Sequence, residues 1–134
     1  MKRSSSAFSP AVLRALNERS NGICEGCGKS PATEAHHRQY KSRGGSGLLS
    51  NALHLCGWGN HTGCHGIAHT VIGEQLGWSI RSGHDPAVVP VFHKADGTWW
   101  RNHEGAEPEL LKPADAVEYM QTIHAIKTGL EVTR

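Results

Sequence analysis

The segment from Cys24 to His69 decides how this chain folds, because residues that bind divalent metals recur along it. It reads Cys24-Glu-Gly-Cys27, then His36-His37, then Asn51, then Cys56, and finally Cys64-His65-Gly-Ile-Ala-His69. Cysteines and histidines are interleaved, and their order suggests two different metal sites. One site would hold the fold together and the other would do chemistry.

The composition favours one small domain outside the membrane. A chain of 134 residues buries only a modest core, so a structural metal would add useful stability. No apolar run is long enough to predict a membrane span. Ser4-Ser5-Ser6 follows Lys2 and Arg3 where a signal peptide would need apolar residues, so we expect a cytoplasmic protein. In that compartment four cysteines favour thiolate ligands over disulfides.

The local patterns predict an α+β fold. Ser9-Pro10 is typical of a helix start, and Asp96-Gly97 of a hairpin turn. The expected helices cover residues 10–20, 64–76 (with Gly73 as a weak point) and 113–127, and the expected strands cover residues 33–37, 52–56, 88–92 and 98–100. We interpret residues 1–8 as a flexible basic arm, 9–77 as the functional core, and 78–134 as a hairpin–helix extension packed on the same domain.

The cysteines predict one closed zinc site. Cys24 and Cys27 have the spacing of a zinc knuckle, and Cys56 and Cys64 can complete a tetrahedral four-cysteine set. Seven residues separate the second pair, and His61 within that spacer is a spare ligand. The alternative is that the four cysteines are buried without a metal.

The histidines predict a second, open metal site. His65 and His69 share one face of a helix because they are four residues apart. His36 and His37 are neighbours on a predicted strand, so their side chains point to opposite faces. One of them can therefore join His65 and His69 on a metal while the other stays free beside it. The alternative is four ordinary surface or core histidines.

The same stretch resembles the HNH nuclease family, whose fold is the ββα-metal finger. The resemblance covers residues 24–69, about a third of the chain, and depends on motif order and spacing. Its motifs are the Cys24/Cys27 knuckle, the His36-His37 pair, Ser50-Asn51-Ala-Leu-His-Leu-Cys56, Cys64-His65 with His69, and Arg43-Gly44-Gly45.

This resemblance implies a metal-dependent endonuclease that hydrolyses DNA phosphodiester bonds and leaves 5′-phosphate and 3′-hydroxyl ends. His36, His65 and His69 would bind the catalytic ion, and His37 would be the general base. Asn51 matches the family asparagine that braces the loop and orients the base histidine. Together His37, Asn51, His36 and His65 are the expected catalytic residues.

The all-imidazole ligand set bears on which metal is used. Many family members have an aspartate where this chain has His36. Magnesium prefers oxygen ligands, whereas manganese, nickel, cobalt and zinc accept imidazole. We therefore expect a structural zinc ion and a catalytic divalent ion that need not be magnesium.

DNA is the expected partner, and a basic loop follows the proposed base. Arg38, Lys41 and Arg43 are candidate phosphate contacts, with a merely solvated loop as the alternative. No DNA-reading helix is visible, so we expect low sequence specificity. Similarity to small phage-encoded members implies a bacterial host cytoplasm and phage packaging proteins as further partners. The sequence leaves open nicking versus double-strand cutting, and the oligomeric state.

Two rival functions remain open at this stage. The first is a DNA-binding zinc finger whose catalytic site is dead, which would need the cysteines but not His37 or the His65/His69 pair. The second is a metal hydrolase of small molecules, which the open basic loop disfavours.

Overall fold

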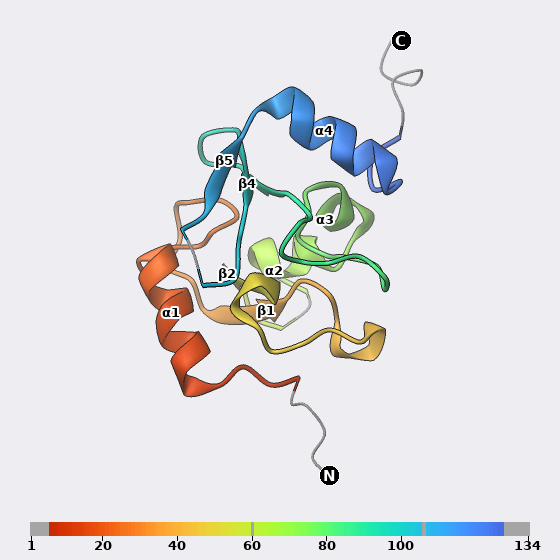
Figure 1. The fold of residues 1–134 in the computed structure, drawn as a ribbon. Helices are drawn as coiled ribbons and strands as arrows, with labels where there is room; N and C mark the ends of the chain where they lie inside the picture. The colour runs from red at the N-terminus through yellow and green to blue at the C-terminus, as the bar shows by residue number, and fades with distance from the viewer. Residues whose placement is uncertain (1–5, 60, 106, 128–134) are drawn as a thin grey trace.

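The computed structural model describes residues 6–59, 61–105 and 107–127, and within them helices alternate with small antiparallel sheets (Figure 1). This confirms the α+β class. In chain order the elements are α1 (Pro10–Ser20), β1 (Glu34–His37), η1 (Lys41–Arg43), η2 (Leu49–Asn51), β2 (Ala52–Leu55), α2 (Gly63–Ala68), α3 (Val71–Gln75), β3 (Val91–His93), β4 (Thr98–Arg101), β5 (Glu109–Leu111) and α4 (Pro113–Thr122). Residues 1–5 of the predicted arm and 128–134 of the extension lie outside the described residues.

Helix α1 begins and ends where the sequence predicts. The Ser9 hydroxyl accepts a hydrogen bond from the Val12 amide at 3.2 Å, with Pro10 as the first helical residue. Asn21 ends the helix in the left-handed region at φ 57°. Arg19 in the last turn donates to the Ala52 carbonyl at 2.8 Å. This bond ties the helix to the start of β2.

Strands β1 and β2 form an antiparallel pair that places the two neighbouring histidines differently. His36 lies opposite Leu53 and His37 lies opposite Ala52. Side chains alternate across a strand, and accordingly His36 is buried whereas His37 is half-buried. The start of α2 lies against the end of β2, where the His65 amide donates to the Cys56 carbonyl at 2.9 Å.

The predicted helix over residues 64–76 is two short helices, not one. Helix α2 ends at Ala68, and α3 begins at Val71 after Thr70, whose hydroxyl accepts from the Gly73 amide. Gly73 packs directly on the Ala68 backbone, where an added Cβ would lie 2.4 Å from the carbonyl oxygen. The chain therefore breaks at His69–Thr70 and not at Gly73, because Thr70 competes as a cap for a new helix.

The second sheet is larger than the predicted hairpin. Strands β3 and β4 flank the expected turn, with Gly97 at φ 70°. Strand β5, which the sequence patterns do not predict, pairs with the other edge of β4. Val88 and Val89 donate to the Asp85 carbonyl in a turn and are not part of a strand. Helix α4 ends at Thr122, shorter than expected, because His124 adopts φ 65°.

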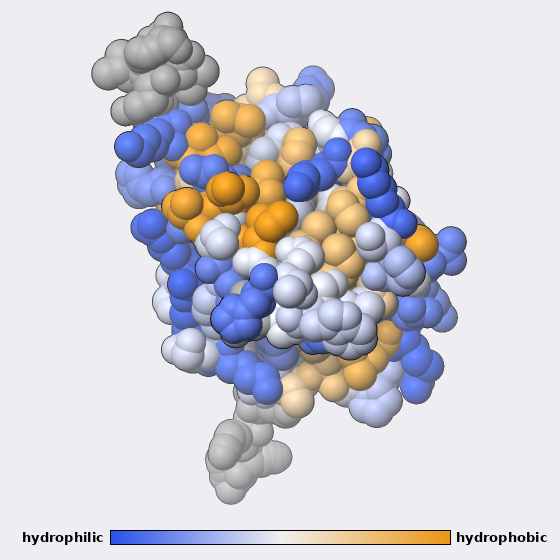
Figure 2. Space-filling model, turned by 180° about the vertical axis from the view of Figure 1, so that it is seen from behind, coloured by the Kyte–Doolittle hydropathy of each residue, from blue (hydrophilic) through white to orange (hydrophobic). Residues whose placement is uncertain are grey.

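Two apolar clusters form the core, and the first crosses the expected boundary at residue 77. Trp78 and Val91 pack with Leu53, Leu55 and the buried cysteines. The second cluster joins β4 to α4 through residues such as Trp99 and Met120. Viewed from behind, apolar atoms also gather on the surface beside the end of α4, over α3 (Figure 2). In the part of the chain that is described, no helix is long and apolar enough to cross a membrane.

Arg38 is a structural residue at the centre of this arrangement. Its side chain is 0% exposed. The guanidinium donates five hydrogen bonds to backbone carbonyls, those of Ser50, Gly77, Pro86, Val89 and Pro90. Burial lowers the pKa of Arg38 to about 9, which still leaves the group charged at neutral pH. The prediction that Arg38 contacts DNA is therefore wrong, because every bond it makes holds loops together.

We predict that Arg38→Ala lowers the free energy of unfolding by at least about 3 kcal/mol, because it leaves several buried carbonyls without a charged donor. Lys41→Ala, a matched loss of a basic side chain at an exposed position, should change it by less than about 0.5 kcal/mol. Urea unfolding of the zinc-loaded proteins measures both. Equal stability of Arg38→Ala and wild type would contradict this assignment.

Candidate metal centres and catalytic pocket

Four cysteines from three separate segments meet in one cluster. Cys24 and Cys27 come from the turn after α1, Cys56 follows β2, and Cys64 lies in the first turn of α2. Their sulfur atoms all lie within 4.8 Å of one another, and the Sγ atoms of Cys27 and Cys56 are 4.0 Å apart. All four thiols are free, since a disulfide requires sulfurs about 2.05 Å apart. The cluster is positioned to bind one metal ion.

The surroundings of Cys24 favour the thiolate form that binds metals. The pKa of Cys24 is lowered to about 4, chiefly by the hydrogen bond from the Cys64 thiol, and backbone amides add to this effect. The amide of Gly26 lies 3.3 Å from its sulfur and that of Cys27 lies 3.4 Å away. The same hydrogen bond to Cys24, together with burial, raises the pKa of Cys64. Four sulfurs lie close together in a closed environment, and that of Cys24 is favoured as a thiolate. These features fit a structural zinc site.

Three histidines form the second cluster. Nitrogen atoms of His36, His65 and His69 lie within 4.8 Å of one another, and the Nε2 atoms of His65 and His69 are 3.3 Å apart. His36 comes from β1, His65 from α2, and His69 directly follows α2. The break after Ala68 does not separate the pair, because His69 still continues the turn as the C-cap residue.

His36 is held in a form that can bind a metal. Its Nε2 lies 2.7 Å from the Trp78 carbonyl, which can only accept, so Nε2 carries the proton and Nδ1 keeps its lone pair. Burial lowers the pKa of His36 to about 3, and it also lowers the pKa values of His65 and His69. All three imidazoles are therefore neutral at pH 7, as ligands must be.

Two residues that the sequence reasoning missed lie next to the cluster. The Tyr40 ring stacks on His69 at 4.9 Å between centroids, and Arg43 covers the Tyr40 ring at 4.3 Å. Glu34 places a carboxylate oxygen 4.0 Å from Nδ1 of His65. Glu34 could have been found from its spacing, since residues 34 and 36 share one face of a strand. Nothing in the local sequence indicates the Tyr40 stack.

The cluster opens into a shallow hollow of about 220 Å³, lined by Ala35, His36, His37, Tyr40, Lys41, His65 and His69. His37 thus lies at the same opening as the three clustered histidines. Lys41 is the member of the predicted basic loop that lines it. Arg43 donates to the Ile80 carbonyl at 3.0 Å while it stacks on Tyr40, so it supports the site from outside.

Asn51 braces the loop that follows β1. It is fully buried, its Oδ1 accepts from the Gln39 amide at 2.7 Å, and its Nδ2 donates to the carbonyls of Gln39 and Ser46. These bonds match the bracing role that the resemblance implies. Among the described hydrogen bonds of its side chain, none reaches His37, so the structure places no direct orienting contact between the two.

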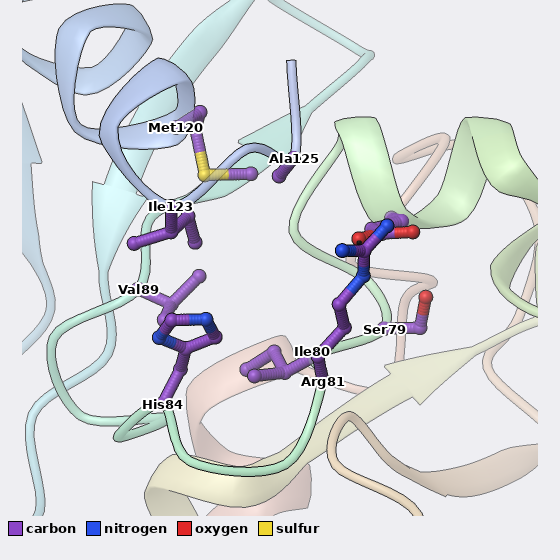
Figure 3. Close-up of a pocket in the computed structure, with 9 residues that line it drawn as sticks. Ser79, Ile80, Arg81, His84, Val89, Met120, Ile123 and Ala125 are labelled. Atoms are coloured by element: carbon purple, nitrogen blue, oxygen red, sulfur yellow. Dashed lines mark ion pairs between the residues drawn. The ribbon is translucent and has the colours of Figure 1, made fainter.

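A second cavity, between α4 and the segment after α3, is a packing gap and not a site (Figure 3). Its volume is about 10 Å³, room for about one water molecule and far below the roughly 300 Å³ at which ligand pockets begin. Its walls are mainly apolar, with Met120 and Ile123 facing Ile80 and Val89, and the Arg81–Glu74 ion pair at 2.6 Å lies at one side. None of the clustered histidines lines it.

Comparison of the chain with protein-family models, with curated proteins and with solved structures finds no match. The chemistry of the cysteine cluster and the histidine cluster is therefore the basis for assigning a function.

We predict about one zinc ion per chain, held by the cysteine cluster. Cys24→Ala should lose the ion and several kcal/mol of stability, because metal-binding free energy in such sites is folding free energy. Elemental analysis of EDTA-washed protein and thermal unfolding measure the two effects. His69→Ala is the matched control and should keep its zinc. An intact fold without zinc would contradict the prediction.

Proposed function

We propose that the protein is a metal-dependent DNA endonuclease of the HNH type. The observation that carries the proposal is that three neutral imidazoles converge at an open hollow that His37 also lines. Three protein ligands leave positions for water and substrate, as a catalytic ion needs. A purely structural zinc finger would have no use for this second cluster.

The order of elements around the hollow supports the same proposal. An antiparallel strand pair is followed by a short helix, and the histidines come from β1 and from the region of α2. This arrangement agrees with the ββα-metal finger that the sequence motifs resemble. The cysteine cluster fixes the entrance to α2 through Cys56 and Cys64, and so fixes the position of His65.

The proposed reaction is hydrolysis of a DNA phosphodiester. A divalent ion bound by His36, His65 and His69 would supply Lewis-acid stabilisation of charge on the scissile phosphate and the leaving 3′ oxygen. Neutral His37 accepts a proton from water as the water oxygen attacks phosphorus in line. The bond from phosphorus to the 3′ oxygen breaks, and that oxygen takes a proton from solvent. The products have 5′-phosphate and 3′-hydroxyl ends.

Lys41 is the proposed phosphate contact at the pocket. It is exposed and lines the hollow next to His37, so its ammonium can pair with a phosphate beside the cut. One lysine that reads no base edge gives affinity without sequence information, consistent with low sequence specificity. A phage origin and packaging partners are hypotheses that depend on the resemblance alone.

The test of the proposal is cleavage of supercoiled plasmid across a panel of divalent metals. We predict that manganese, nickel or cobalt supports cleavage at least as well as magnesium at matched concentration, because the ligands are imidazoles and not carboxylates. Exclusive use of magnesium would mean that the ligand set is wrong. DNA binding without cleavage in every metal would favour the zinc-finger alternative.

We predict that His37→Ala lowers the cleavage rate on the order of 10²–10⁴-fold, the usual contribution of a general base. Affinity for the catalytic ion should change little, because this side chain is proposed to contact water and not the ion. His65→Ala should instead lose metal affinity together with rate. Single-turnover cleavage and calorimetric metal titration separate the two variants.

The pH profile should follow from the same role. Burial, and to a lesser extent the charge of Lys41, lower the pKa of His37, and the hydrogen bond with Ser6 opposes them in part. A base must be neutral, so activity should rise through this lowered pKa. The acid limb should therefore lie below the ordinary histidine value of about 6.5, with activity already high at pH 7. A maximum near pH 5 would remove His37 from the mechanism.

A further inference from the structure

We propose that residues Ser6–Phe8 are a positioning clamp for His37, which fixes the tautomer and the plane of the base. The proposal rests on the nuclease function above and names the residues that orient its base. The resemblance suggests Asn51 for this role, but the side-chain hydrogen bonds described for Asn51 go to Gln39 and Ser46. The contacts that His37 does make come from the N-terminal segment.

The first contact sets the tautomer. Nε2 of His37 lies 2.5 Å from the Ser6 carbonyl oxygen. A carbonyl only accepts hydrogen bonds, so Nε2 must carry the proton. In neutral His37 the lone pair is then on Nδ1, and the base acts through that atom. A backbone carbonyl provides this selection regardless of which side chain residue 6 has.

The second contact sets the ring plane. The Phe8 and His37 rings stack with centroids 3.9 Å apart and planes 16° apart. This parallel contact covers one face of the imidazole. Yet His37 still lines the hollow, whereas Ser6 and Phe8 do not. The segment that holds the ring therefore does not itself line the hollow.

Contacts on both sides of Ser6–Phe8 hold this segment next to His37. Ser9, next to Phe8, caps α1, and Arg19 of the same helix bonds to Ala52, the residue opposite His37 in β2. On the other side the segment crosses Gly47 so closely that a Cβ there would lie 2.1 Å from the Ala7 carbonyl oxygen. Asn51 holds the adjoining Ser46 at 2.8 Å. Asn51 thus acts on the base indirectly, by fixing the loop over which the segment passes.

The clamp can be tested without activity by long-range ¹H–¹⁵N NMR of the histidine rings in the full, zinc-loaded chain. We expect His37 in the Nε2–H form, with ring shifts that move in Phe8→Ala and are largely retained in Phe8→Tyr. An Nδ1–H tautomer in the wild type, or His37 shifts indifferent to Phe8→Ala, would overturn the clamp. This result stands even if the chain cleaves no DNA, which would instead overturn the nuclease proposal.

Kinetics then test whether the clamp positions the base. Phe8→Ala, and deletion of residues 2–8, should lower kcat on the order of 10–100-fold, with KM within about twofold. Phe8→Tyr and deletion of residues 2–5, which keeps Ser6–Phe8, should stay near the wild-type rate. Gly47→Ala, which pushes the segment away, should resemble Phe8→Ala.

A double mutant distinguishes positioning from general destabilisation. Since Phe8 is proposed to act only through His37, Phe8→Ala should cause no further loss of rate in the His37→Ala background. Multiplicative losses in the double mutant would overturn the proposal. So would a higher kcat on deletion of residues 2–8, which would make the segment an inhibitor. Zinc content and urea midpoints show whether the compared variants are folded. If the deletion variant does not fold, the point variants alone test whether Phe8 positions His37.

Discussion

The convergence of four thiols on one point is the constraint on which the rest of the structure depends. Cys24 and Cys27 lie before β1, Cys56 follows β2, and Cys64 lies in the first turn of α2, so the cluster joins the segments on both sides of the strand pair. With 134 residues, the chain has little apolar area with which to fix those segments otherwise. Trp78 completes the enclosure: its ring packs so closely on Gly26 that a Cβ there would lie 2.8 Å away. The cysteine cluster and the first apolar cluster are thus one unit.

That unit positions the clustered histidines without itself contacting the proposed substrate. Cys64 and His65 are neighbours, so fixing the sulfur of one limits where the imidazole of the other can lie. The Trp78 backbone carbonyl accepts from His36, and the Trp78 ring covers the cysteine side, so one residue connects both clusters. His37 reaches the hollow from the other side of the same strand. Strand alternation is therefore what separates the buried His36 from the half-buried His37, the proposed base.

The sequence predicted well what local spacing controls. Ser9-Pro10, the Asp96-Gly97 turn, the alternation at His36-His37 and the Cys24/Cys27 knuckle each depend on neighbours within a few residues. Arg38 could not be assigned in the same way. It lies beside Lys41 and Arg43 in sequence, but its five partners are spread from Ser50 to Pro90. Whether an arginine faces solvent or carbonyls depends on that long-range packing. Strand β5 likewise forms because β4 offers it a free edge.

The N-terminal segment shows a further limit of motif reasoning. Residues rich in serine with two basic neighbours suggest a loose arm, and nothing in their spacing refers to His37. Contact arises because α1 is anchored at Ala52 and because Gly47 lacks a side chain where the segment crosses. The motif points to His37 as the proposed base, but the group that sets its tautomer is the Ser6 backbone carbonyl. Any residue at position 6 would present the same carbonyl, so the sequence does not reveal it. Such a partner can come from any segment that the fold brings within reach, and here it comes from outside the motif.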